Sequence, residues 1–289
     1  MKVARSIPGI RKQVADAVKE GRGVGLVPTM GALHAGHLSL VDRARAECGF
    51  VVVSIFVNPT QFAPGEDFDT YPCTPEADLA ACERHGADAV FMPAATEMYP
   101  PEARTTVSVS GLARTLCGRS RPTHFAGVCT IVAKLFNAVG PDRAYFGRKD
   151  YQQYVIIKRM AADLDFPVEV VGCPTVREAD GLAMSSRNAN LTDEQRAQAP
   201  ALYRSLQQAE DRIRESQPPA GEVLEAIRNR LAENAPLGAV DYVQIVDPET
   251  LEEVEATDRP VVIALAVRFG GARLIDNIFV DDTPGRDVQ

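Results

Sequence analysis

One stretch constrains the fold of this chain more than any other: L-V-P-T-M-G-A-L-H-A-G-H-L at residues 26–38. It begins as an apolar run, breaks at Pro28 and resumes after Gly36 with the spacing of a helix. A run of this kind is typical of the strand, loop and helix start of one α/β unit. His34 and His37 lie three residues apart at the expected start of the helix, on one face of its first turn. Free backbone N–H groups and the helix dipole attract anions there, so the pair predicts a phosphate site.

Further apolar runs alternate with helical patterns over the first part of the chain. The expected strands are residues 24–27, 50–57, 87–92, 143–147 and 166–171, with a β-rich edge segment at 105–109. The expected helices are residues 10–20, 37–48, 75–85, 125–139 and about 151–163. The run F-V-V-V-S-I-F-V at 50–57 is typical of a parallel strand covered on both faces. Residues 1–176 are therefore predicted to form a Rossmann-like parallel sheet with helices on both faces, the domain that binds the ligands.

The pattern changes from Thr192 onward. The expected elements are a capped helix at 192–215, a helix at 220–233, and strands at 240–246, 259–267 and 272–279. The loops between these strands are too short for crossover helices, so the strands are expected to be antiparallel. We therefore predict a smaller C-terminal α+β domain, residues 177–289, that acts as a lid.

Composition excludes several classes of partner. The formal net charge of −8 and the pI near 5.2 argue against nucleic acid or an anionic membrane surface. No apolar run approaches the roughly 20 residues that a membrane-spanning helix needs. The six cysteines form no C-x-x-C pair, which favours reduced thiols over a zinc site or a disulfide framework. A cytoplasmic location is the expectation.

Polar residues follow two of the expected structural elements. Asn58 and Gln61 come directly after the 50–57 strand, where open α/β sheets bind their ligands. Amides donate and accept hydrogen bonds, which suits hydroxyl and carboxylate groups, although Asn58 before Pro59 is equally consistent with an Asx turn. Arg121 and His124 precede the 125–139 helix, and solvent exposure explains them as well as substrate binding does.

A second group of residues has the chemistry of phosphate and ribose binding. Lys149 carries a mobile charge suited to β and γ phosphates, and the adjacent Asp150 suits either a ribose hydroxyl or a helix N-cap. The M-S-S-R sequence at 184–187 combines two hydroxyls with a guanidinium fork, a combination suited to phosphate. Asp78 is consistent with a magnesium ligand or, more simply, with an acid in the first turn of a helix. The metal ligands stay unassigned.

The motifs that hold these residues resemble the pantothenate synthetase family, the pantoate–β-alanine ligases of the H-x-G-H nucleotidyl-transfer superfamily. The matching segments are P-T-M-G-A-L-H-A-G-H, N-P-T-Q-F, R-P-T-H-F-A-G-V, F-G-R-K-D-Y-Q-Q and G-L-A-M-S-S-R-N, and the resemblance runs from about residue 27 to residue 277. Arg148 stands where the family usually has Glu. That departure leaves Gly147, Lys149 and Asp150 in place.

The resemblance implies a two-step ligase of coenzyme A biosynthesis. ATP and (R)-pantoate would form a pantoyl adenylate and pyrophosphate, and β-alanine would then displace AMP to give pantothenate, with Mg²⁺ accompanying ATP and a homodimer as the assembly. The implied catalytic residues are His34, His37 and Lys149. The implied ATP-binding residues are Met30, His34, His37, Gly147, Lys149, Asp150, Val176, Met184, Ser185, Ser186 and Arg187. The implied pantoate- or β-alanine-binding residues are Asn58, Gln61, Arg121, His124 and Gln153.

Charge at the histidines is a further expectation from the sequence. His34, His37, Lys149 and Arg187 are expected to act as cations around the polyphosphate, with His37 donating a proton near neutral pH. Two other functions fit part of the pattern: a nucleotidylyltransferase that keeps the nucleotide in its product, and a nucleotide-binding regulator without chemistry. The complete cationic set argues against the regulator, and the neutral amides Gln61 and Gln153 argue against a phosphorylated substrate.

Overall fold

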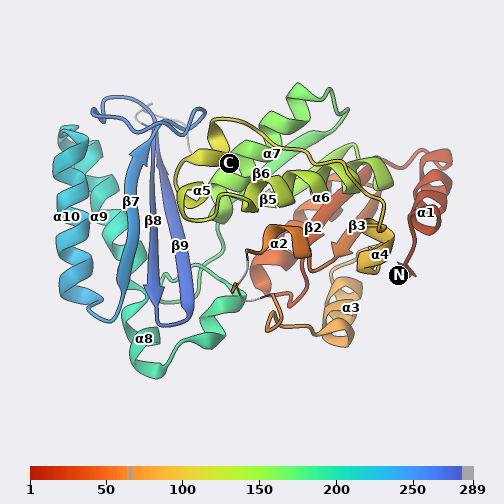
Figure 1. The fold of residues 1–289 in the computed structure, drawn as a ribbon, viewed down its shortest axis with the longest axis horizontal. Helices are drawn as coiled ribbons and strands as arrows, with labels where there is room; N and C mark the ends of the chain where they lie inside the picture. Colours follow the sequence, from red (N-terminus) through yellow and green to blue (C-terminus); the bar gives the residue numbers. More distant parts are fainter. Residues whose placement is uncertain (64, 67, 282–289) are drawn as a thin grey trace. The chain divides into compact units, whose positions relative to one another are not determined.

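The computed structural model describes residues 1–63, 65–66 and 68–281 (Figure 1). The chain divides into two compact units, one of Met1–Arg114 with Gly118–Val176 and one of Thr115–Cys117 with Arg177–Gln289. Within the described residues, no helix has both the length and the apolar character needed to cross a membrane.

The first unit contains a six-stranded sheet with the order β1-β4-β3-β2-β5-β6, in which every neighbouring pair is parallel. Its strands are β1 (Lys2–Ala4), β2 (Val24–Thr29), β3 (Phe50–Ile55), β4 (Ala89–Phe91), β5 (Arg143–Gly147) and β6 (Glu169–Cys173). Its helices are α1 (Ile7–Lys19), α2 (Ala35–Glu47), α3 (Pro75–Arg84), α4 (Ala95–Met98), α6 (His124–Val139) and α7 (Tyr151–Asp163), and the residues of α5 (Cys117–Ser120) divide between the units. Short 3₁₀ helices are η1 (Pro59–Gln61), η2 (Leu112–Arg114) and η3 (Arg148–Asp150).

Helices cover both faces of this sheet, as the apolar strands require. Every residue of β3 is buried, because helices pack on each side of it. Helices α2 and α3 share one core with the strands, while α6 packs against both α1 and α7. The predicted Rossmann-like parallel sheet is therefore confirmed.

Strands β2 and β5 are neighbours at the centre of the sheet, and the chain leaves them in different directions. β2 leads into α2, and β5 leads through η3 into α7. The crevice beyond the carboxyl ends of two such strands is where open α/β sheets bind ligands. Strand β2 also extends through Pro28 to Thr29, beyond its expected end, because its pairing with β5 stops at Leu26 and needs no N–H from the proline.

The second unit contains a three-stranded antiparallel sheet with the order β7-β8-β9. Its elements are η4 (Ser186–Asn190), α8 (Asp193–Gln198), α9 (Ala201–Ser216), α10 (Ala220–Asn234), β7 (Ala239–Val246), β8 (Val261–Phe269) and β9 (Ala272–Val280). Helix α9 packs on β9 and α10 packs on β7, which buries an apolar core between helices and sheet. The predicted antiparallel sheet is confirmed.

Two expectations about these elements were wrong, and one strand was missed. Residues 105–109 form no strand, because the backbone N–H of Val107 donates to Thr130 Oγ1 on α6 (3.0 Å) rather than to another strand. The expected helix at 192–215 is two helices, α8 and α9, which meet at Pro200, a residue that lacks the N–H needed to continue a helix. Strand β1 was not predicted, since it is short and mostly exposed.

Candidate active site

His34 and His37 fold the start of α2 into a capping box made of two imidazoles. His34 is the N-cap residue, with φ −126° and ψ 173°, and its Nδ1 accepts a hydrogen bond from the Gly36 N–H at 3.1 Å. The His37 Nδ1 in turn accepts from the His34 N–H at 3.4 Å. The ring centroids lie 4.0 Å apart. Ring nitrogens therefore accept hydrogen bonds from the backbone N–H groups at the N-terminus of α2, a role that Ser and Glu side chains usually have in a capping box.

These hydrogen bonds fix the position of the proton on each ring. A ring nitrogen that accepts carries no proton, so both neutral imidazoles carry it on Nε2 and present Nε2–H as a donor. Among the described residues, no hydrogen bond involves either Nε2 atom. Burial lowers the pKa of His37 to about 3, with a further contribution from His34, and burial followed by the charge of Lys149 lowers the pKa of His34. The expectation of two cationic histidines is therefore wrong for the ligand-free chain, because burial keeps them neutral.

The loop between β2 and α2 is held by Asp78, a residue of α3. Gly31 and Ala32 both have positive φ angles, +87° and +49°. The buried Asp78 carboxylate accepts from the N–H of Ala32 at 3.0 Å and from that of Leu33 at 2.8 Å. Thr74 is the N-cap residue of α3 by position, but its Oγ1 donates to the same carboxylate at 3.2 Å and makes no capping hydrogen bond. The sequence did not indicate this role, because residue spacing does not reveal a contact between α3 and this loop.

The end of β5 brings a cation and a carboxylate next to the two histidines. Lys149 Nζ lies 3.8 Å from Asp150 Oδ2, and the charges of both residues act on His34 and His37. Asp150 is the N-cap of α7 by position, yet its side chain makes no capping hydrogen bond. Gly147 closes β5 immediately before them. The first unit thus brings the predicted phosphate-binding residues at the start of α2 and in η3 close together.

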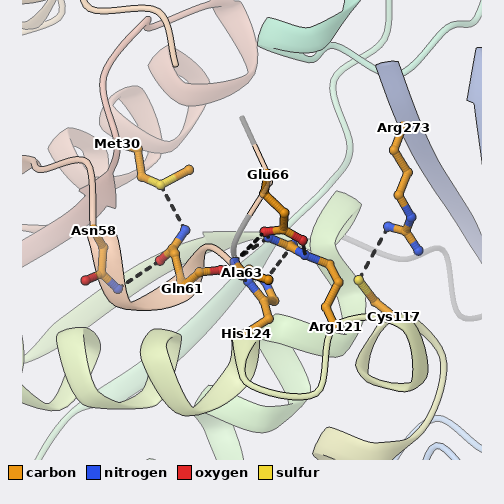
Figure 2. A network of polar contacts seen from close by, with 9 residues as sticks. All are labelled: Met30, Asn58, Gln61, Ala63, Glu66, Cys117, Arg121, His124 and Arg273. Atoms are coloured by element: carbon orange, nitrogen blue, oxygen red, sulfur yellow. Dashed lines mark hydrogen bonds and ion pairs between the residues drawn. The ribbon is translucent and has the colours of Figure 1, made fainter. Parts of the chain in front are cut away.

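The amides that follow β3 form a buried chain of contacts (Figure 2). Asn58 is 1% exposed; its Nδ2 donates to Gln61 Oε1 and to the Gly127 carbonyl, both at 3.1 Å, and its Oδ1 accepts from the hydroxyl of Tyr99 at 2.8 Å. Gln61 Nε2 lies 2.9 Å from the sulfur of Met30. The contacts of Asn58 within the protein favour a positioning role for it over a contact with substrate.

Gln153 and its neighbour Gln152 differ in environment although both lie in the first turn of α7. Gln152 is buried, and its Nε2 donates to the Leu112 carbonyl at 2.9 Å. Gln153, the predicted substrate ligand, is only partly buried. This difference favours a structural role for Gln152 and leaves the amide of Gln153 accessible.

Arg121 and His124 both contact the backbone carbonyl of Gln61 (Figure 2). His124 Nδ1 lies 2.8 Å from that oxygen and Arg121 Nη2 lies 3.2 Å from it. The His124 Nε2 faces Arg121 Nη1 at 3.2 Å, and burial together with the Arg121 charge lowers the pKa of His124 to about 4. Both predicted substrate ligands thus support the segment that carries Gln61.

Glu66, which sequence reasoning missed, completes this cluster. Its two carboxylate oxygens accept from Arg121 Nε at 2.7 Å and from Arg121 Nη2 at 2.6 Å. Burial alone would raise the pKa of Glu66, but the hydrogen bonds from Arg121 and the Ala63 N–H outweigh it and hold that pKa below its ordinary value. The carboxylate therefore stays charged and fixes the guanidinium in a two-pronged geometry.

In the second unit, a hydrogen bond and an ion pair hold the loop that contains residues 184–187. Ser185 caps η4, and its Oγ accepts from the Arg187 N–H at 3.3 Å. At the base of the loop, Arg177 pairs with the buried Asp276 through bonds of 2.7 and 3.0 Å. All four predicted phosphate-binding residues are partly buried, as is Val176, the last residue of the first unit.

A metal site does not emerge from the protein side chains alone. Within the described part of the chain, no group of three or more His, Cys, Asp or Glu residues is placed to hold an ion. Asp78, which sequence left open as a magnesium ligand, already accepts two backbone N–H groups and a hydroxyl.

A parallel sheet with this crevice, two neutral imidazoles at a helix N-terminus and an adjacent lysine define a nucleotide-binding α/β protein of the H-x-G-H class. Residues 2–279 match the family described as pantoate-beta-alanine ligase. The chain belongs to this family.

Relatives and solved structures agree with this assignment over nearly the whole chain. The chain is 51% identical to a pantothenate synthetase of Solidesulfovibrio magneticus, over 98% of this chain and 100% of that one, and 52% identical to one of Thermotoga neapolitana, over 96% and 99%. A crystal structure of pantothenate synthetase from Thermus thermophilus is similar with a TM-score of 0.91 and 47% identity, over 96% and 99% of the two chains. A ligase structure from Francisella tularensis, complexed with beta-gamma ATP and beta-alanine, is similar with a TM-score of 0.80 and 34% identity, over 96% and 97%.

Proposed function

We propose that this chain condenses (R)-pantoate with β-alanine at the expense of ATP, releasing AMP and pyrophosphate. Family membership supports the reaction. The observation that carries the mechanism is the pair of Nε2–H donors of His34 and His37 beside Lys149, at the carboxyl ends of β2 and β5.

In the first step, a pantoate carboxylate oxygen attacks the α-phosphorus of ATP and pyrophosphate leaves. Negative charge grows on the oxygen between the α and β phosphates, and preorganised donors at that position stabilise the transition state. His34 and His37 supply such donors as neutral imidazoles, and Lys149 supplies a positive charge. The histidines act by hydrogen bonding and hand over no proton.

In the second step, the amine of β-alanine attacks the carbonyl carbon of the adenylate and AMP leaves with the bridging oxygen. We assign Gln61 and Gln153 to the acyl group, because neutral amides bind hydroxyls and carboxylates. Asn58, Arg121 and His124 act through Gln61 rather than on the substrate. No protein nucleophile takes part.

The remaining ATP assignments are proposals of the same kind. Asp150 accepts from ribose hydroxyls, and Met30, Gly147 and Val176 line the nucleotide. Ser185, Ser186 and Arg187, next to Met184, offer two hydroxyls and a guanidinium to phosphate. A variant Arg187→Ala is expected to raise KM for ATP and leave KM for pantoate unchanged.

Magnesium enters this proposal only with the nucleotide. Mg²⁺ is commonly bound by substrate phosphates and few protein carboxylates, so we expect it to accompany ATP. No step of the mechanism above is assigned to it.

We further propose a homodimer in the cytoplasm. None of the six cysteines forms a disulfide bond, and reduced cysteines are typical of a reducing compartment. Light scattering on the purified chain tests the assembly, with twice the chain mass of 31.3 kDa as the expected result.

Product analysis tests the function as a whole. The purified chain is incubated with ATP, pantoate and β-alanine, and pantothenate, AMP and pyrophosphate are expected in equal amounts. A nucleotidylyltransferase would keep AMP in its product, and a binding protein would form no product.

A further inference from the structure

Asp78 lies outside the predicted site residues, yet its carboxylate contacts the loop from which His34 and His37 emerge. It is 3% exposed, and its two oxygens accept from the N–H groups of Ala32 and Leu33. The Thr74 hydroxyl donates a third hydrogen bond. A buried carboxylate is costly unless hydrogen bonds compensate it, and here most of that compensation comes from the backbone of the loop.

The loop needs such support because its backbone is strained. Ala32 has a φ of +49°, in the left-handed region that is unfavourable for a residue with a side chain. The preceding Gly31 has a φ of +87°, and a Cβ there would lie 3.1 Å from an Asp78 oxygen. Strained residues persist only where the surrounding structure holds them, and they are concentrated at functional sites.

We propose that Asp78 is a positioning residue for the two histidines. By bonding Ala32 and Leu33, it holds the turn that places His34 at the N-cap of α2, and the capping box then fixes the proton of both rings on Nε2. The inference deepens the proposed function and rests on it for its catalytic consequence, but the proton positions are measurable without substrate.

The structure offers a matched control at the other end of β2. Asp142 also accepts a backbone N–H, from Val24 at 2.7 Å, but Val24 begins β2 whereas Ala32 follows its end. Changing Asp142 to Asn therefore removes the charge of a similar acceptor far from the histidines and weakens its hydrogen bond. A rescue variant is also available, because Gly adopts the left-handed conformation of residue 32 without the strain.

The experiment compares Asp78→Asn, Asp142→Asn and the double variant Asp78→Asn/Ala32→Gly by ¹⁵N NMR of the ring nitrogens. The chain has only four histidines, so each can be assigned. In Asp78→Asn, the signals of His34 and His37 are expected to leave the pure Nε2–H pattern. His85, at the end of the same helix α3, and His124 are expected to keep their signals, which shows that the unit is still folded.

Kinetics of pantoate-dependent ATP–pyrophosphate exchange form the second readout. Misplacement of reacting groups by about 1 Å costs up to about 10²-fold in rate, so kcat of Asp78→Asn is expected to fall about ten- to a hundredfold with KM for pantoate unchanged. The double variant is expected to recover part of that loss, and Asp142→Asn is expected to keep the full rate. Recovery by Ala32→Gly distinguishes support of a strained turn from general packing.

Three outcomes would overturn the proposal: unchanged His34 and His37 signals in Asp78→Asn, signals of all four histidines that move together, or a Mg²⁺ requirement that shifts while the ring signals stay constant. Absence of exchange in the unmodified chain would instead refute the proposed function. The ring signals would then still decide whether Asp78 positions the histidines.

Discussion

The backbone N–H of His34 donates to Nδ1 of His37 at 3.4 Å, so one histidine fixes the proton position on the other. With Nδ1 of His34 also occupied, both rings can offer only Nε2–H. The helix cap thus determines the chemistry of the site as well as the start of α2.

Removal of one of these donors is expected to slow adenylate formation. His37→Ala should reduce the rate of ATP–pyrophosphate exchange by about 10²- to 10³-fold, the usual effect of losing one donor to a developing negative charge. His37→Asn should recover part of the rate, because its amide restores an N–H. The control is His85→Ala. His85 lies at the end of α3 and pairs with Asp42 of α2, so its loss should leave the rate unchanged. Near-normal turnover of His37→Ala would rule out this assignment.

Burial of the histidines predicts a pH dependence of stability. The pKa is lowered from 6.5 to about 3 in His37 and to about 4 in His124. Between each lowered pKa and 6.5, the unfolded chain therefore binds more protons than the folded one. Stability therefore rises with pH in this window and is lost as pH falls from about 6.5 toward 4 and 3. Urea unfolding at pH 7 and 5.5 should show the loss. A His37→Asn/His124→Asn double variant with an equal loss would contradict the assignment.

The amides of Gln61 and Gln153 are expected to affect the binding of the acyl substrate alone. Gln61→Ala and Gln153→Ala should raise KM for pantoate at least several-fold and leave the affinity for an ATP analogue, measured by calorimetry, unchanged. The matched control is Gln152→Ala, whose amide bonds the Leu112 carbonyl; it should lower the melting temperature without changing KM for pantoate. A large loss of nucleotide affinity in Gln61→Ala would place that amide on the other side of the α-phosphate.

The Glu66–Arg121 pair is expected to act on pantoate through Gln61. Glu66→Gln removes the charge that orients Arg121, and Arg121→Lys removes the two-pronged geometry, so each should raise KM for pantoate. Their effects should not add in the double variant, because both break one interaction. Asp163→Asn breaks the exposed Arg159–Asp163 pair and should have no effect. Additive effects of the Glu66 and Arg121 changes would exclude the proposed coupling.

The sequence predicted the sheets and the phosphate-binding motifs because those features are local. Continuous Val/Ile runs indicated β3, and the spacing of His34 and His37 placed them at a helix start. The sequence could not predict contacts between segments that are distant along the chain. Examples are the hydrogen bond from Ala32 to Asp78 and the ion pair between Glu66 and Arg121. The prediction that His37 is positively charged was also wrong, because burial lowers the pKa of its side chain and residue type does not reveal burial.

The fate of one oxygen atom tests the central claim most directly. If pantoate is activated as an acyl adenylate, a carboxylate oxygen becomes the bridge to phosphorus and stays with AMP when β-alanine attacks the carbonyl carbon. Pantoate labelled with oxygen-18 in its carboxylate should therefore give AMP that contains one labelled oxygen, and ATP–pyrophosphate exchange should require pantoate but not β-alanine. Formation of ADP with labelled inorganic phosphate, or of AMP without the label, would contradict the mechanism even if pantothenate were made.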